Sequence, residues 1–480
     1  MELSSTASPT TVIDTSTAPW KLVLKLAAPT VFAMLTQSVV NEVDIVFFSW
    51  LPCPESSNAQ AALLPSLILL WLFGGSLSAI SVGTQAFSAR RFAEGRYGEA
   101  GGVLNNSWVF ALLAGVLFTA IGYLTLPWTV AAIIKVPAVQ AAAHEYLKWR
   151  LLGIASMVMT FSFKSFFDGI GKTHVHMVSA IVMNAVNIVL CLILIFGRFG
   201  FPRMGIEGAG IAGFLSTWIG LFIMVGWAML PSYREKFGPF DLRKLSKPLT
   251  WSILKLSVPS GVATIAVMTG FLLFAMIVSK LDSMVPSALV ATGPCGGRNE
   301  PVNSAATTVI VGVLKLTFTA CLAFGTSTAT LVSQCLGAKQ PERAEGFGWV
   351  SVRLGLVIFG IVGLLEGVLF PREILAFVSH SEAVQSAALL PMRLMGICTP
   401  LIAVGMILTQ ALFGAGNSRY VMIVELILHF SCLVPLAWIL GITLNFGLVG
   451  IWSAAIIYVL LLCVAMVWKF HRGDWKHIVL

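Results

Sequence analysis

Twelve long runs of apolar residues constrain this chain more than any other feature. Each run has about 20 or more mostly apolar residues, the length that an α-helix needs to cross the hydrocarbon core of a bilayer. Only 11% of the 480 residues are charged, whereas a soluble domain carries roughly 25%. We therefore expect an all-α membrane protein with twelve transmembrane helices. The runs lie at about 22–50, 60–88, 103–126, 143–168, 177–197, 208–230, 253–281, 304–335, 350–370, 386–413, 420–441 and 447–468.

The basic residues of the chain lie mainly in the short breaks between these runs. The net charge of +9 comes from 30 Lys and Arg against 21 Asp and Glu, and its distribution indicates membrane topology, so no nucleic-acid partner is expected. If the N-terminus is inside, nineteen basic residues fall on the inner side and nine, including Lys148 and Arg150, on the outer side. This bias predicts a multi-pass protein of the cell (plasma or inner) membrane with both termini in the cytoplasm.

The segments outside the runs suggest a division of the chain into five parts. Residues 1–20 are rich in Ser and Thr and lack the early Lys or Arg and the apolar core of a signal peptide. We expect them to form a disordered cytoplasmic tail. The other parts are an N-terminal lobe at 21–230, a cytoplasmic linker at 231–250, a C-terminal lobe at 251–470 and a cytoplasmic tail at 471–480.

The second half of the chain repeats the first. LKLAAPT at 24–30 returns as LKLSVPS at 254–260, and GIEGAGIA at 205–212 resembles GLVGIWSA at 447–454. The offset grows from 230 to about 242–245, which an insertion near 292–301 explains. Each repeat holds six runs, an even number, so two six-helix lobes should be related by a pseudo-two-fold axis along the membrane normal. Rocking of two such lobes gives alternating access, which favours a secondary transporter over a channel.

Asp44 is the leading candidate for a functional residue because it lies inside the first run. A charged side chain in a spanning helix costs about 2.5–3.5 kcal/mol on insertion scales, so an intramembrane acid is a functional candidate by default. Its carboxylate is suited to bind a proton, or Na+ together with amide oxygens, and Asn41 lies one turn earlier on the same face. The alternative is that Asp44 lies near the outer end of its helix and is simply hydrated.

Other polar residues in the runs have both a functional and a packing interpretation. Asn184 and Asn187 are three apart on one helix face, where they could help to bind a cation or could hydrogen-bond between helices. Pro29 removes one helical hydrogen bond from the first run, which makes it a candidate hinge or an ordinary kink. Lys164 and Asp168, four residues apart, are expected to form a snorkelling pair.

The C-terminal half contains a second group of ionisable residues in its runs. Glu425 and His429 are four apart and can touch, so with Lys315 they form a candidate proton relay near neutral pH. The alternative is a mutually neutralising pair. Glu366 is a further acid in the ninth run. Cys53 and Cys295 lie in equivalent outer loops and could form a disulfide in an oxidising compartment.

Several motifs in register resemble the multidrug and toxic compound extrusion (MATE) family. They are PTVFAMLTQSVVNEVDIVFFSWL in the first run, GTQAFSARRFAEGRYGEA at 83–100 with its copy at 327–344, and NIVLCLILIFG at 187–197 followed by GIEGAGIAG. The resemblance covers roughly residues 20–470. It implies a V-shaped pair of six-helix lobes that exports organic, often cationic, compounds in exchange for H+ or Na+.

The resemblance also suggests roles for particular residues. Pro29 matches a proline at which the family's first helix is thought to bend, and Asn187 matches an Asn of the cation site in the N-terminal lobe. Cys191 stands where the family commonly has Asp or Asn, and Gly213 where it has Thr, so this site has lost ligands. Val267 and Ile402 stand where some members carry acids for Na+. The balance favours H+ over Na+ as the coupling ion, with no cofactor and no metal.

We therefore expect a monomeric antiporter in the lipid bilayer that exports small organic, cationic and amphipathic compounds. A flippase of lipid-linked intermediates with the same two-lobe plan is the alternative, although Lys315 and Lys164 are thin support for it. An intramembrane enzyme is disfavoured because the HExxH and GxSxG motifs and zinc-ligand spacings are missing. Aromatic and Met side chains could line the cavity; candidates are Phe32, Met34, Phe73, Met157, Met159, Phe163, Met183 and Met276.

Overall fold

The computed structural model describes residues 17–52, 55–134, 136–284, 290–292, 299–379 and 381–480. In this part of the chain, eleven helical stretches are long and apolar enough to cross a membrane, and the bent pair α5–α6 makes a twelfth. All twelve runs seen in the sequence are therefore helical. Cys53 and Cys295, the two cysteines considered for a disulfide, lie outside the described residues.

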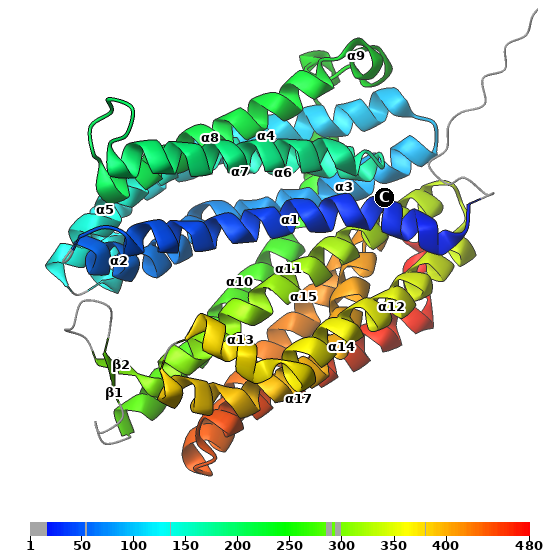
Figure 1. Cartoon of the computed structure of the whole chain (residues 1–480). Helices are drawn as coiled ribbons and strands as arrows, with labels where there is room; N and C mark the ends of the chain where they lie inside the picture. The colour runs from blue at the N-terminus through cyan, green and yellow to red at the C-terminus, as the bar shows by residue number, and fades with distance from the viewer. Residues whose placement is uncertain (1–16, 53–54, 135, 285–289, 293–298, 380) are drawn as a thin grey trace, which may run out of the picture.

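The N-terminal lobe contains the first six spans (Figure 1). A helix satisfies its backbone polar groups internally, as the interior of a bilayer requires, and some spans are built from more than one helical segment. The segments are α1 (Pro19–Ser49), α2 (Glu55–Leu70), the π-helix η1 (Trp71–Gly75), the 3-10 helix η2 (Ser76–Ala79), α3 (Ile80–Ala93), α4 (Tyr97–Ile133), α5 (Pro137–Leu152), α6 (Ile154–Gly169), α7 (Thr173–Phe196) and α8 (Gly205–Ala228).

A short linker with α9 (Pro231–Phe237) and η3 (Leu242–Lys244) leads to the C-terminal lobe. Three segments of the C-terminal lobe are π-helices. The π-helix η4 ends the ninth span, η5 lies within the eleventh span, and η6 ends the eleventh span. The segments are α10 (Lys247–Met284), β1 (Val290–Thr292), β2 (Asn299–Pro301), α11 (Val302–Gly337), α12 (Pro341–Leu364), η4 (Leu365–Leu369), α13 (Pro371–Val378), α14 (Glu382–Ala415), α15 (Ser418–Ile427), η5 (Leu428–Leu433), α16 (Val434–Trp438), η6 (Ile439–Thr443), α17 (Gly447–Arg472) and η7 (Asp474–His477).

Strands β1 and β2 are a small departure from the all-helical expectation. They pair antiparallel with Val290 opposite Pro301 and Thr292 opposite Asn299. This pair lies at 290–301, within the segment where the change in repeat offset indicated an insertion. The C-terminal lobe thus has a longer connection between its first two spans than the N-terminal lobe has.

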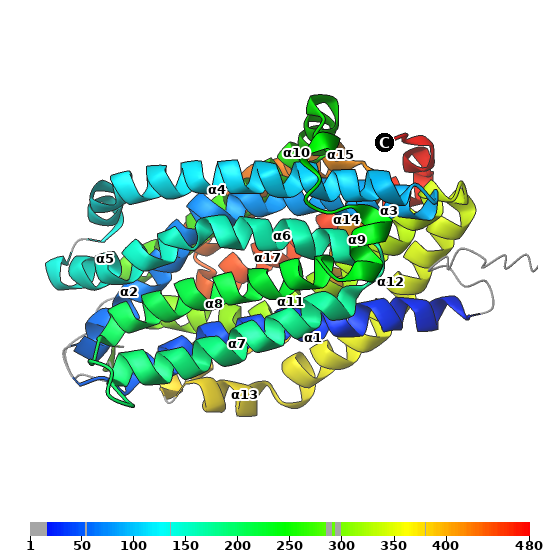
Figure 2. The same cartoon turned by 90° about the horizontal axis from the view of Figure 1, so that it is seen from above.

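Equivalent helices pack in the same way in the two lobes, as expected for a duplicated fold. The first span packs on the fifth in one lobe (α1 on α7), and α10 packs on α15 in the other. Likewise α4 packs on α6, and α12 packs on α14. Figure 2 shows α4, α6, α8 and α7 side by side in the N-terminal lobe, with α1 next to α7.

The two lobes meet at the end of the molecule where α1 begins and α17 ends, which we call the closed end. From here the two groups of helices diverge towards α2, α5 and the β1–β2 pair (Figure 1). Helix α3 packs on α10 and α11, and α1 packs on α11 as well as on α7. Helix α1 therefore contacts both its own lobe and the opposite lobe.

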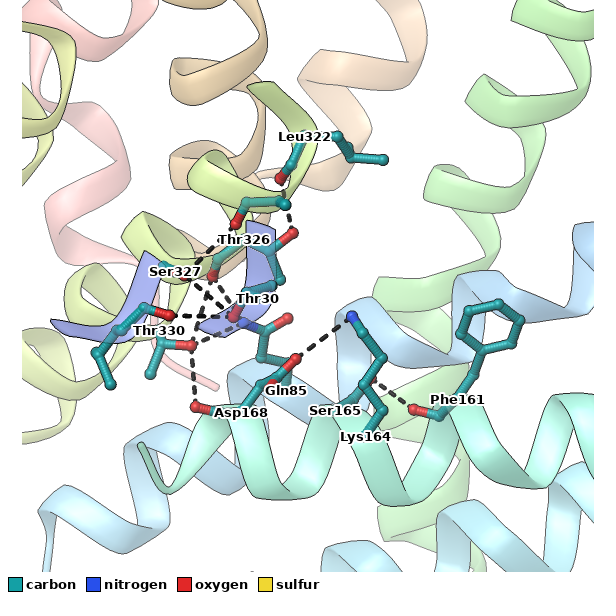
Figure 3. Close-up of polar contacts among 12 residues, drawn as sticks. Thr30, Gln85, Phe161, Lys164, Ser165, Asp168, Leu322, Thr326, Ser327 and Thr330 are labelled. Carbon is teal, nitrogen blue, oxygen red and sulfur yellow. Dashed lines mark hydrogen bonds and ion pairs between the residues drawn. The ribbon is translucent and has the colours of Figure 1, made fainter. Parts of the chain in front are cut away.

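Hydrogen bonds between the lobes at the closed end connect α3 and α6 with α11 (Figure 3). The Gln85 Nε2 atom donates to the Thr326 carbonyl at 2.9 Å and to Thr330 Oγ1 at 2.8 Å. Thr330 Oγ1 in turn donates to the Asp168 carbonyl at 3.1 Å. Gln334 Nε2 donates to the Gly169 carbonyl at 2.7 Å. These polar groups are buried, so breaking the contact requires water to replace their partners.

Arg90 extends this contact to the last residues of the chain. Its Nη2 donates to the Ala415 carbonyl at 2.9 Å and its Nη1 donates to the Ile478 carbonyl at 2.6 Å. The Arg90 side chain is buried, so its charged guanidinium is shielded from water where it binds the two carbonyl oxygens. Trp475 is fully buried nearby and stacks on Phe470 with ring centres 4.6 Å apart. The final turn of the chain is thus part of the contact between the lobes.

Gly396 provides a test of how closely two spans of the C-terminal lobe approach. A Cβ atom at this position would lie about 2.6 Å from the backbone nitrogen of Gly367 in the adjacent span. We expect Gly396→Ala to destabilise the protein by about 1–3 kcal/mol, as overpacking does. The matched control is Gly360→Ala on α12, where a Cβ atom would meet nothing within 4 Å. Thermal unfolding in detergent should show a lower midpoint for the first variant, and equal midpoints would contradict this packing.

Candidate functional site

Asp44 lies on α1 and faces α7 of its own lobe. The Cys191 thiol of α7 donates to Asp44 Oδ1, with the sulfur 3.6 Å from the oxygen. Cys191 is fully buried, and Asp44 is half-buried. The carboxylate therefore contacts the interior of the lobe on one side. The alternative interpretation, in which Asp44 is simply hydrated near the outer end of its helix, does not account for this contact.

A chain of polar contacts continues from Asp44 across α7 to α8. Cys191 Sγ also lies 3.8 Å from Asn187 Oδ1, and Asn187 Nδ2 donates to Ser216 Oγ at 3.2 Å. Asn187 is buried, as is Ser216. The spacing of three and four residues on α7 places these groups on one face. The structure thus brings Asp44 and Asn187 to opposite sides of the same thiol.

Asn184 lies on the same face of α7 but contacts a different part of α1. Its Nδ2 atom donates to Thr36 Oγ1 at 3.0 Å. Thr36 is two turns before Asp44, so Asn184 joins the two helices without touching the carboxylate. This geometry agrees with the packing interpretation of Asn184. Asn41 lies in α1, but its side chain is outside the described residues.

Arg150 is a member of this site that the sequence analysis placed among the outer basic residues. It lies in the last turn of α5, just before the 47° bend between α5 and α6. Its guanidinium lies against Gly213 of α8 and 5.8 Å from the ring centre of Tyr146. The positive charge of Arg150 acts on Asp44, Cys191 and Tyr146. The basic-residue count did not show that this side chain packs against α8 within the lobe.

Pro29 lies inside the continuous helix α1, near the closed end. The next residue, Thr30, donates to the Leu26 carbonyl at 3.1 Å and accepts from Ser327 Oγ of α11 at 3.5 Å. The weakened turn around Pro29 is therefore next to a contact between the lobes (Figure 3). A bend of α1 at this point would alter both.

Glu425 and His429 touch each other in the C-terminal lobe, as their spacing predicted. His429 Nδ1 lies 3.3 Å from Glu425 Oε2, and Tyr458 of α17 donates its hydroxyl to the same oxygen at 2.9 Å. His429 is fully buried in the π-helix η5, against Gly270 of α10. Tyr458 was missed in the sequence because its contact depends on how α17 packs. Lys315, the third residue of the candidate relay, is half-buried on α11.

Two further acids in the spans, Glu366 and Asp168, also have polar partners. Glu366 Oε1 accepts from Thr317 Oγ1 at 2.7 Å. Lys164 Nζ and Asp168 Oδ2 are 3.3 Å apart, so the predicted pair forms. Asp168 is buried beside the closed end, whereas Lys164 is half-buried. Among the described residues, no group of three or more His, Cys, Asp or Glu is arranged to hold a metal ion.

The candidate cavity residues differ in burial. Phe163 and Met159 are buried in the core of the N-terminal lobe. Four others are half-buried, namely Met34, Phe73, Met157 and Met183. Phe32 and Met276 are more than half exposed. Met276 lines a pocket of about 720 Å³ between α10 and α16, together with Lys280 and Trp438.

Comparison with known proteins places the chain in a family. The MatE family model matches residues 29–193 and 295–439, which together are more than half of the chain. The chain belongs to the MatE family. It is therefore a membrane transporter, and the resemblance seen in its motifs is confirmed.

Relatives of this MatE protein match it over nearly its whole length. A probable multidrug resistance protein NorM of Thermotoga maritima is 26% identical over 470 residues, covering 95% of this chain and 93% of the relative. The probable multidrug resistance protein YoeA of Bacillus subtilis is 24% identical, covering 95% and 94%. A solved outward-facing conformation of a multidrug resistance MATE family transporter has a TM-score of 0.83 at 19% identity, covering 96% and 98%. This last comparison confirms the two-lobe fold.

Proposed function

We propose that this MatE protein is an antiporter that exports small organic, cationic and amphipathic compounds in exchange for protons. The names of its relatives as multidrug resistance proteins support the substrate class. The position of α1 is the observation that carries the coupling. This helix holds Asp44 against α7 of one lobe and packs on α11 of the other. Protonation of Asp44 can therefore influence how the two lobes sit together.

Protons are favoured over Na+ by the atoms that surround Asp44. A proton needs one carboxylate, whereas Na+ needs several oxygen ligands, and the group that contacts Asp44 here is the thiol of Cys191. Sulfur is a soft ligand that does not suit such hard cations. One proton moving down a potential of 100 mV provides about 2.3 kcal/mol, which is enough to drive a modest accumulation of substrate.

The closed end is proposed to face the cytoplasm. Arg90 and Arg91 lie in the last turn of α3 at this end, and Arg96 follows in the turn before α4. The excess of inner basic residues supports this orientation. The structure then represents an outward-facing state of a monomer in the cell membrane. Asn184 and Asn187 are proposed to support the Asp44 site, Pro29 to be the hinge, and Glu425, His429 and Lys315 to be a proton relay in the second lobe.

Dye accumulation in everted membrane vesicles tests the proposed function. The lumen of such vesicles corresponds to the outside of the cell, so an acidic lumen should drive a cationic dye inward. We expect a pH gradient to drive accumulation and a Na+ gradient of equal size to have no effect. Accumulation driven by Na+ alone would refute proton coupling. Transport of a fluorescent lipid without any dye transport would favour the flippase.

A further inference from the structure

The space beside Gly213 is occupied by the side chain of Arg150. A Cβ atom at position 213 would overlap the Nη1 atom of Arg150. The guanidinium thus enters the region between α5, α7 and α8 only because α8 has no side chain there. The Nε atom of Arg150 is buried and has no hydrogen-bond partner. This costly arrangement indicates that the charge is placed there for an interaction within the lobe.

Asp44 is the acid with which the positive charge of Arg150 interacts. Arg150 lies against Gly213, and Ser216 donates its hydroxyl to the Gly213 carbonyl at 3.1 Å. Ser216 also accepts from Asn187, and the Cys191 thiol contacts both Asn187 and Asp44. This geometry places Arg150 at the Asp44 site, where its positive charge acts on the carboxylate. The neighbouring basic residue on α5, Lys148, is turned elsewhere, with its ammonium 2.8 Å from Glu207 and 3.3 Å from Glu145. Arg150 is therefore the positive charge that balances the carboxylate of α1.

A fixed guanidinium opposes the binding of any cation to Asp44, but an alkali ion and a proton differ in what else they need. A metal ion beside Asp44 would be repelled by the nearby positive charge, and repulsion between like charges is strong where water is excluded. It would also need oxygen ligands, whereas the Cys191 sulfur takes one position and Asn187 is bonded to Ser216. A proton forms a covalent bond with the carboxylate and needs no such shell. Protonation also neutralises the Asp44 carboxylate, so Arg150 loses the negative charge that balances it.

We propose that Arg150 determines the ion specificity of the Asp44 site. Its guanidinium is a tethered cation in the place that an alkali ion would require, so the site accepts a proton and excludes Na+. This inference rests on the proposed coupling role of Asp44. The inference adds Arg150 to the coupling site. It also explains why the site can lack oxygen ligands at Cys191 and Gly213.

Direct binding of radioactive ²²Na+ to the purified protein in a scintillation proximity assay tests this proposal. Four proteins form a cycle: the wild type, Arg150→Gln, Cys191→Asp and the double variant. Cys191→Asp supplies a second carboxylate, and Arg150→Gln removes the tethered cation. We expect the double variant to bind Na+ at least tenfold more tightly than Cys191→Asp alone, and the wild type to bind none.

Lys148→Gln is the matched control, because it removes the same charge from the same helix two residues away. We expect it to leave Na+ binding unchanged when combined with Cys191→Asp. Equal Na+ affinity of Cys191→Asp with and without Arg150 would overturn the proposal, as would a monodisperse double variant that binds no Na+. If the double variant aggregates, Arg150→Gln with Cys191→Asn provides the same comparison. The assay measures no transport, so its outcome is separate from the dye test of proton coupling.

Discussion

Asp44→Asn should abolish proton-driven accumulation of substrate while leaving a folded protein. A pH gradient of two units provides about 2.7 kcal/mol per proton, enough for roughly 100-fold accumulation by one proton per substrate. Without a group that takes up the proton, the ratio of substrate inside to outside should fall to about one. Asn has the same size as Asp and keeps an oxygen that can accept a hydrogen bond from the Cys191 thiol. The packing of α1 on α7 should therefore persist.

The measurement is steady-state accumulation of a cationic dye in everted vesicles with an acidic lumen. Asp241→Asn is the matched control, because this acid lies in the linker and accepts a hydrogen bond from the backbone nitrogen of Arg243 at 3.1 Å. It should accumulate dye as the wild type does. Undiminished accumulation by Asp44→Asn would remove Asp44 from the coupling mechanism. The two-lobe fold would not be affected by that result.

Arg90→Gln should shift the protein away from the state with a closed end. Hydrogen bonds from a charged donor contribute about 1.5–3 kcal/mol each, and Arg90 makes two of them to the opposite lobe. Losing about 3 kcal/mol changes an equilibrium constant about 100-fold. If the closed and open states otherwise differ by only a few kcal/mol, the open state should become readily detectable.

A cysteine at position 333 can report this opening. Ser333 is fully buried and its hydroxyl donates to the Ala86 carbonyl of the other lobe at 3.0 Å. Labelling of Ser333→Cys by a charged maleimide, in a background where the buried Cys335 is replaced by Ala, should be about tenfold or more faster with Arg90→Gln. Arg91→Gln is the control, because Arg91 pairs with Glu99 of its own lobe. Equal labelling rates in the two arginine variants would contradict the role of Arg90.

The fold was predictable from the sequence because a bilayer limits the choices. A spanning segment must be a long apolar helix, so hydropathy located the spans, and the match of LKLAAPT with LKLSVPS revealed the two lobes. The β1–β2 pair was not predicted, since only an insertion could be inferred near residue 292. The contacts at the closed end could not be predicted from the sequence either. Its contacts join residues that are far apart in the sequence, such as Gln85 and Thr326, which are 241 positions apart.

The candidate site was predictable only in part. Helical spacing placed Asn184 and Asn187 on one face of α7, and a carboxylate in an apolar run drew attention to Asp44. Spacing cannot show which neighbouring helix a face meets, so the contact through Cys191 emerged only from packing. The contact of Arg150 with α8 was missed for a related reason. It depends on how α5 packs on α8 and on the space at Gly213, which the sequence does not show.

Most of the closed-end hydrogen bonds end on main-chain oxygens. The Ala86, Asp168, Gly169, Thr326, Ala415 and Ile478 carbonyls accept from side chains of the opposite lobe. Every amino acid supplies such an oxygen, so replacing the side chain at an acceptor position preserves the bond if the backbone keeps its course. Mutational scanning should therefore find an asymmetric tolerance. The donors Gln85, Arg90 and Gln334 should accept few replacements, while a half-buried acceptor position such as Ile478 should accept more.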